Sequence, residues 1–190
     1  MILPVVAYGH PSLRKETAEI DKDYPNLEEF IGNMFETMYA SSGIGLAAPQ
    51  VNKSIRVFIV DASPLADEKP ELADFKKVFI NPNIVEESGA EWTYNEGCLS
   101  FPDLREDVTR KGTVKIQYFD EDWNFHEETY NGMPARIIQH EYDHLEGTLF
   151  VDRINPLKRM LLKRKLNDIS KGNVDVSYKM TFPLLKKKPA

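Results

Sequence analysis

Apolar side chains recur at helical spacing early in the chain. Between Pro25 and Tyr39 they fall three or four residues apart, which predicts an amphipathic helix over this segment. The apolar stripe consists of Leu27, Phe30, Ile31, Met34, Phe35 and Met38. Proline suits the first position of a helix, and Ser41-Ser42-Gly43 predicts the loop that follows.

Two more helices are predicted nearer the C-terminus. One runs from about Pro134 to Glu146 and stops at Gly147, a residue typical of helix ends. The other begins after Asn155-Pro156, a capping residue followed by a first-position proline, and ends near Gly172. Its packed positions are expected to include Leu157, Leu161 and Leu162.

The strands are predicted by continuous or alternating apolar positions. Ile55–Val60 (IRVFIV), apolar except for Arg56, predicts a buried strand, and Thr113–Phe119 alternates between apolar and polar side chains. Phe125–Tyr130 is the expected return strand of a hairpin, and Val78–Ile84 is expected to be extended. Residues 62–74 hold two prolines and many charges, which predicts a surface loop. Strands before and around a central helix predict an α+β domain.

Composition limits the class of protein. The 190 residues suffice for one domain with a single core, and 42% hydrophobic with 28% charged residues excludes a disordered, collagen-like or coiled-coil chain. There is no apolar run of about 18 residues and no basic leader, so neither a membrane span nor a secretory signal is expected. The single cysteine, Cys98, cannot form an internal disulfide. A reducing compartment, and with no transit peptide a bacterial cytoplasm, is therefore expected.

The helix predicted over 134–146 carries an HExxH motif, His140-Glu141-Tyr142-Asp143-His144. Residues four apart share a helix face, so both imidazoles can reach one metal ion while Glu141 contacts a water molecule beside it. The alternative is a pair of surface histidines. Ile137 and Ile138, one turn earlier, favour a buried helix in which such polar side chains need partners.

A catalytic site of this type needs a third protein ligand and leaves the fourth position open. No histidine follows His144, and Glu146 faces away, so the motif lacks the downstream ligand of many HExxH peptidases. Cys98 stands in the turn-like segment Glu96–Ser100 (EGCLS). A lone cysteine is usually a small buried hydrophobe. With the two histidines it would instead form a Cys-His-His site that favours iron or zinc over magnesium.

A third segment, Gly43–Gln50 (GIGLAAPQ), combines two glycines with a glutamine. It is not a dinucleotide fingerprint, because no strand precedes it and no third glycine opens a helix. It offers backbone with little side-chain cover, able to pair with an extended peptide, and Gln50 adds a neutral amide donor. The alternative is a tight turn with a glutamine that faces solvent.

Together these segments resemble the peptide deformylase family. The resemblance consists of GxGxAAxQ at Gly43–Gln50, EGCLS at Glu96–Ser100 and QHExDHL at Gln139–Leu145, with every motif position intact. Each motif is moderately specific, but all three in this order in a chain of this size are highly specific. The similarity runs from roughly Pro4 to Arg153.

The resemblance implies a metallohydrolase that removes the formyl group from the N-terminal formyl-methionine of newly made polypeptides, giving formate and a free N-terminus. It implies one divalent metal per chain: ferrous iron in the cell, with zinc, nickel or cobalt able to occupy the site in purified protein. The implied fold is α+β, with antiparallel sheets packed around the central HExxH helix, and we expect a C-terminal helix and an extended tail beyond it.

The residue types fit the hydrolysis of a formamide, which needs an activated water, a stabilised oxyanion and a proton for the leaving amine. A metal on the Cys98, His140 and His144 site would lower the pKa of the water. Glu141 would take the proton and pass it to the amine. The oxyanion would lie near the side-chain amide of Gln50 and the backbone N–H of Leu99.

The remaining candidates surround the substrate and the ligands. The methionine pocket is expected to consist of Ile44, Tyr94, Ile137 and the aliphatic part of Arg136. Gly43 and Gly45 would leave backbone free to pair with the peptide. Arg105 is expected at the edge of the site, beside the peptide backbone or carboxylate. Glu96 is expected to be paired with Arg110 and to support the ligands from behind.

Two other classes of function remain open on the sequence alone. Another HExxH metallopeptidase would need a ligand after the helix, and none is visible. A structural metal-binding module would need a fourth protein ligand, and the spare histidines, His10 and His126, are assigned to surface roles. The expected partner is a formyl-methionyl nascent peptide, with no membrane partner and no specific DNA partner.

Charge divides the chain into two parts. Residues 156–190 contain ten Lys or Arg and two Asp or Glu, a net charge of +8, whereas residues 1–155 carry −14. We expect 1–155 to be the catalytic domain and 156–190 to be a basic helix and tail packed on it. The acidic body would be repelled by RNA, and the basic helix would supply a weak, salt-sensitive contact with the ribosome. The side chains expected to remain exposed for it are Lys158, Arg159, Lys163, Arg164 and Lys165. The alternative is a helix that only packs on the domain.

Overall fold

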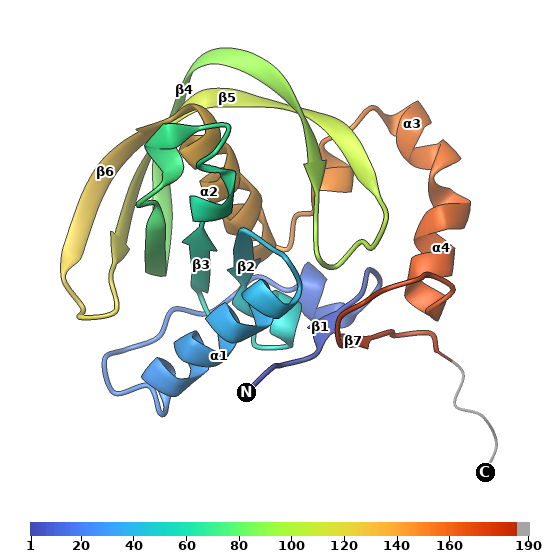
Figure 1. Cartoon of the computed structure of the whole chain (residues 1–190), viewed down its shortest axis with the longest axis horizontal. Helices are drawn as coiled ribbons and strands as arrows, with labels where there is room; N and C mark the ends of the chain where they lie inside the picture. The colour runs from blue at the N-terminus through green and yellow to red at the C-terminus, as the bar shows by residue number, and fades with distance from the viewer. Residues whose placement is uncertain (186–190) are drawn as a thin grey trace.

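The computed structural model describes residues 1–185 and is built on a five-stranded antiparallel sheet in the order β2-β3-β4-β5-β6 (Figure 1). Its strands are β2 (Gly45–Ala47), β3 (Val57–Asp61), β4 (Lys76–Gly97), β5 (Arg105–Phe119) and β6 (Phe125–Asn131). A separate parallel pair joins β1 (Val5–Val6) to β7 (Met180–Thr181), so the two ends of the described chain lie together.

The central helix, α2 (Gly132–Leu145), packs against one face of the sheet. The alternation predicted in β5 is confirmed, since Val114, Ile116 and Tyr118 are all buried in the cluster that α2 covers. The expected α+β arrangement around the HExxH helix is therefore confirmed. Gly147 follows α2 with φ +67°, and a β-carbon there would lie 2.8 Å from the carbonyl oxygen of Arg14. Only glycine fits this turn comfortably.

The first helix, α1 (Leu27–Ala40), covers a second apolar cluster through Leu27, Ile31, Met34 and Met38. The predicted helix is confirmed, but its predicted start is wrong. Asn26 has a left-handed backbone, φ 57°, immediately before the first helical residue. Pro25 therefore belongs to the preceding turn and not to the first turn of the helix.

The strands β4 and β5 are much longer than the sequence predicts, and they pair with each other as a hairpin. The segments Val78–Ile84 and Thr113–Phe119 cover only part of each strand, and both strands continue beyond them in a curved arm (Figure 1). Three register shifts interrupt their pairing, and irregularities of this kind bend a hairpin. Residues 85–97 are not buried on both faces of the strand. Their sequence therefore lacks the run of apolar residues that would predict a strand there. At the end of this arm, β4 stops beside α2, immediately before Cys98.

Smaller elements also differ from the predictions. The strand expected over Ile55–Val60 begins at Val57, because Ile55 forms an isolated bridge with Ala18. The return strand of the hairpin is confirmed as β6. The loop expected over 62–74 contains two short 3-10 helices, and its Leu72 is fully buried.

The single helix expected after Asn155-Pro156 is two helices, α3 (Pro156–Leu161) and α4 (Lys163–Lys171), with a break at Leu162. The expectation that Leu157 and Leu161 are packed is wrong, because they are 68% and 80% exposed. Leu162 is partly buried, as expected.

The break explains which side chains are packed. It changes the direction of the helical face, so α4 contacts the domain through Leu166 and Ile169 in the cluster around Phe101 and Phe150. The expected tail extends to residue 190, and residues 186–190 lie outside the described residues. No helix within residues 1–185 is long and apolar enough to cross a membrane.

Candidate metal centre and active site

Three potential ligands from two parts of the chain converge. Cys98 follows the end of β4, and His140 and His144 lie one turn apart on α2. One donor atom from each lies within 4.8 Å of the others, and Cys98 Sγ is 3.3 Å from His144 Nε2. Among residues 1–185 this is the only such group of three or more His, Cys, Asp or Glu side chains. The spare histidines do not join it, since His10 contacts Ser12 and His126 contacts Asp120.

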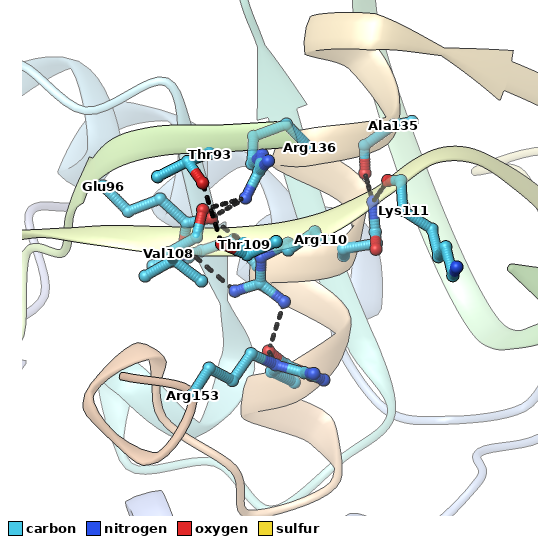
Figure 2. A network of polar contacts seen from close by, with 12 residues as sticks. Thr93, Glu96, Val108, Thr109, Arg110, Lys111, Ala135, Arg136 and Arg153 are labelled. Carbon is cyan, nitrogen blue, oxygen red and sulfur yellow. Dashed lines mark hydrogen bonds and ion pairs between the residues drawn. The ribbon is translucent and has the colours of Figure 1, made fainter. Parts of the chain in front are cut away.

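The buried carboxylate of Glu96, which Figure 2 shows beside Arg110 and Arg136, orients the first histidine from behind. Glu96 Oε2 lies 2.9 Å from His140 Nδ1, which leaves His140 Nε2 to face the ligand group. Arg110 donates to Glu96 from Nε at 2.7 Å and from Nη2 at 3.0 Å. Burial opposes ionisation of Glu96, but the hydrogen bonds with His140 and Arg110 outweigh it and hold the pKa of Glu96 well below its usual range.

Two further residues extend this network, and sequence reasoning missed both connections. Arg136 donates to Glu96 Oε1 at 2.8 Å, and its guanidinium lies over the ring of Trp92. Asp143 accepts from Arg110 Nη1 at 2.7 Å and from Arg153 Nε at 2.6 Å. Because Asp143 directly precedes His144 on α2, its contacts hold the helix beside the ligands.

Glu141 is buried next to the ligands without a compensating partner. Its Oε2 has no hydrogen bond, and its Oε1 lies so close to Gly45 that a β-carbon there would overlap it. Burial raises the pKa of Glu141 to about 7, although nearby His140 opposes the shift. A carboxyl group with this pKa can both accept and return a proton near neutrality.

Gln50 is held with its amide nitrogen toward the cysteine. Its Oε1 accepts from the backbone N–H of Ala47 at 2.9 Å, which fixes the orientation of the amide. Its Nε2 then lies 3.4 Å from Cys98 Sγ and 3.3 Å from Ser100 Oγ. The solvent-facing glutamine considered as an alternative is excluded, because Gln50 is only 2% exposed.

A cavity of about 550 Å³ opens onto this arrangement. All seven residues expected around the substrate line it, together with Gln50, Cys98, Leu99, His140 and Glu141. Those lining residues are Gly43, Ile44, Gly45, Tyr94, Arg105, Arg136 and Ile137. Arg105 lies at the exposed edge, as expected, where its Nε donates to Asn95 Oδ1 at 3.1 Å.

Other lining residues were not among the candidates. They include Met133 on α2 and a C-terminal stretch, Asp175–Tyr178. The hydroxyl of Tyr178 donates to the carbonyl oxygen of Leu99 at 2.6 Å, across 79 positions of sequence. No local sequence pattern predicts such a contact, because the two residues meet only through the fold of the whole domain.

The donor set fits a divalent metal ion. A cysteine sulfur and two imidazoles on one side, with a buried unpaired carboxylate oxygen beside them, form an open three-ligand site. Burial lowers the pKa of His144 well below its usual range and keeps its imidazole neutral, as a ligand must be. No fourth protein ligand joins them among residues 1–185, unlike a structural site.

Comparison with known proteins gives one consistent result. A family model described as polypeptide deformylase matches residues 2–160. A peptide deformylase of Christiangramia forsetii is 56% identical over 98% of this chain and 99% of its own length. The solved peptide deformylase of Legionella pneumophila has a TM-score of 0.79 and 36% identity, covering 91% of this chain and 98% of its own. That of Plasmodium falciparum has a TM-score of 0.78 and 40% identity, covering 87% and 94%.

Proposed function

The chain belongs to the polypeptide deformylase family, and on this premise we propose how its own residues carry out the reaction. The protein is a metal-dependent hydrolase that removes the formyl group from the N-terminal formyl-methionine of newly made polypeptides, leaving formate and a free N-terminus. One observation carries the assignment of roles. The Cys98, His140 and His144 group lies in the same cavity as the unpaired carboxylate oxygen of Glu141.

Cys98 Sγ and the Nε2 atoms of His140 and His144 would hold one divalent ion. When bound, the ion supplies a Lewis acid that polarises the formyl oxygen and lowers the pKa of a water molecule. Thiolate and imidazole ligands suit iron and zinc better than hard cations. We assign ferrous iron as the metal in the cell, with zinc, nickel or cobalt able to occupy the same site in purified protein.

Glu141 is the proton carrier. It accepts a proton from the attacking water and returns it to the amine that leaves. Its pKa of about 7 supports both steps at neutral pH. Its packing against Gly45 fixes the carboxylate at one place in the cavity.

Gln50 and Leu99 stabilise the oxyanion. The amide of Gln50 is oriented by Ala47 and presents its N–H groups beside Cys98. Leu99 follows the same cysteine and lines the cavity, and its backbone N–H would be the second donor. Donors held in place before the reaction stabilise the developing charge at little reorganisation cost.

The substrate binds along the edge of the sheet. β2 is the edge strand, and Gly45 within it pairs with Val60 on one side only, so the outer side can accept an extended peptide. Gly43 continues this backbone. The methionine side chain enters between Ile44, Tyr94 and Ile137 beside the aliphatic part of Arg136, and Arg105 contacts the peptide at the open end.

A mass-spectrometric assay on a formyl-methionyl tripeptide tests the roles. The wild type should release formate, and Glu141→Ala should retain metal but lose nearly all turnover, because only the proton carrier is removed. Cys98→Ala should lose metal. A matched internal peptide without the formyl group distinguishes a general metallopeptidase, which would cleave it. Full turnover by Glu141→Ala would contradict its assignment.

We also propose that the protein works in the bacterial cytoplasm and makes a weak contact with the ribosome through α3 and α4. Of the five side chains expected to be exposed, three contact the body. Lys158 pairs with Glu106, Arg159 pairs with Asp152, and Lys165 bonds to the backbone of Asp103. Lys163 and Arg164 are exposed and remain the strongest candidates for contacts with RNA phosphates.

A further inference from the structure

The chain beyond α4 returns to the catalytic cavity and is tied down on both sides of it. On the near side, Asn173 N–H donates to Asp168 O at 2.9 Å, closing the end of α4. On the far side, Val5 N–H donates to Lys179 O and Ala7 N–H donates to Thr181 O, both at 2.9 Å. Residues 175–178 between these ties line the cavity. The segment is therefore a fixed wall of the site.

Three successive carbonyl groups beside the metal ligand are each held from a different direction. Cys98 O accepts from Phe101 N at 2.9 Å, within the local turn. Ser100 O accepts from Tyr8 N at 2.9 Å, from the N-terminal region. Leu99 O, between them, accepts from the hydroxyl of Tyr178 at 2.6 Å. Tyr178 is thus the one side chain among these three donors.

We infer that Tyr178 is a positioning residue for the oxyanion donor. A peptide unit is planar, so the bond to Cys98 O also orients the Leu99 N–H on the other side of that unit. The next unit, which contains Leu99 O, is oriented by Tyr178. The two units meet at the Leu99 α-carbon, and the contacts of Tyr178 and Phe101 together restrict rotation there.

This inference rests on the proposed role of the Leu99 N–H. The Leu99 side chain gives independent support, because it packs against Gly43 closely enough that a β-carbon there would lie 2.8 Å from Leu99 Cδ1. Leu99 is thereby held between the substrate-binding backbone and the C-terminal wall. A small rotation of Leu99 would move its N–H away from the oxyanion, and displacements of this size lower rates strongly.

The test is Tyr178→Phe, which keeps the ring and removes only the donor. With a formyl-methionyl tripeptide, kcat should fall about three- to tenfold, as expected for one neutral hydrogen bond, while KM stays within about twofold. Metal content and Tm should match the wild type. Tyr118→Phe is the control, because it removes a tyrosine hydroxyl that donates to Glu128 at 2.5 Å but does not line the cavity. Its kcat should be unchanged.

Any other outcome contradicts the inference. An unchanged kcat, or a rise in KM alone, would make Tyr178 only part of the wall. A loss of kcat accompanied by loss of metal or a large fall in Tm would assign it a structural role. The wild-type rate distinguishes failure of this inference from failure of the proposed function. A wild type that releases no formate contradicts the proposed function itself, whatever Tyr178→Phe does.

Discussion

The Glu141 carboxylate lies where a β-carbon of residue 45 would stand, so Gly45 has no room for a side chain while the carboxylate keeps its place. Gly45→Ala should displace the carboxylate and lower kcat about 100-fold, the scale expected for a misplacement of about 1 Å. Metal content should be unchanged, because none of the three ligands moves. Steady-state kinetics and metal analysis measure both quantities.

Gly32→Ala is the matched control for that substitution. Gly32 lies within α1, and a β-carbon there would meet no atom within 4 Å. The control should keep full activity and gain about 0.5–1 kcal/mol of stability, because alanine is the better helix former. Equal activity of the Gly45→Ala variant and the control would contradict the steric argument.

The network around Glu96 predicts a second result. Glu96→Gln keeps the shape of the side chain but leaves the buried guanidinium groups of Arg110 and Arg136 without their carboxylate. The free energy of unfolding should fall by about 3 kcal/mol and metal affinity about 10- to 100-fold. Denaturant unfolding and competition with a chelator measure these changes. Glu127→Gln, which breaks the exposed pair with Lys115, should leave metal affinity unchanged.

A third prediction concerns acid stability of the β5–β6 turn. Burial opposes ionisation of Asp120, but hydrogen bonds with His126 and Asn124 outweigh it and lower the pKa of Asp120 to about 2. A carboxyl group with a lowered folded-state pKa stabilises the protein above its unfolded-state pKa of about 4. That stabilisation is lost as the pH falls from about 4 toward 2.

Asp120→Asn measures the contribution. At pH 7 the variant should be less stable than the wild type by about 1 kcal/mol or less, because the carboxylate still borders solvent. The difference between the two proteins should shrink as the pH falls below about 4. Chemical denaturation at several pH values gives this difference directly. A gap that stays constant down to pH 2 would show that charge is not its source.

The fourth prediction concerns the basic helices. Lys163→Glu with Arg164→Glu should reduce co-sedimentation with ribosomes at low salt, and high salt should abolish binding of the wild type. Lys22→Glu with Lys53→Glu makes the same charge change on the body, where both side chains are exposed, and should bind like the wild type. If both double variants sediment equally, α3 and α4 are structural only.

The ligand group illustrates what the sequence reveals about the site. The i, i+4 spacing of His140 and His144 and the single cysteine already restrict the ligands, because helical geometry and chemistry are local properties. Glu96 and Arg110 could be paired from the sequence since their strands were close in order. The contact of Arg136 with Glu96 could not, because it depends on how the curved arm crosses α2.

The C-terminal region shows where sequence periodicity is insufficient. Leu157 and Leu161 have helical spacing, yet they are exposed because the helix breaks at Leu162 and the domain is contacted by the next helix. The arm of β4 and β5 was underestimated for a related reason. Residues 85–97 are strand because β5 pairs with them. Their outer face is polar, so the hydrophobic pattern of the sequence does not indicate the pairing.

The parallel pairing of β1 with β7 has a consequence for biosynthesis. Val5 and Ala7 precede every metal ligand in the sequence, and their partners Lys179 and Thr181 follow all of them. A growing chain can assemble its sheet and its HExxH helix, but it has no closed wall at the cavity until Tyr178 and the strand that follows it have also been made. The wall is thus completed after every metal ligand has been made, and a copy that terminates before Tyr178 carries all three ligands in an unfinished site.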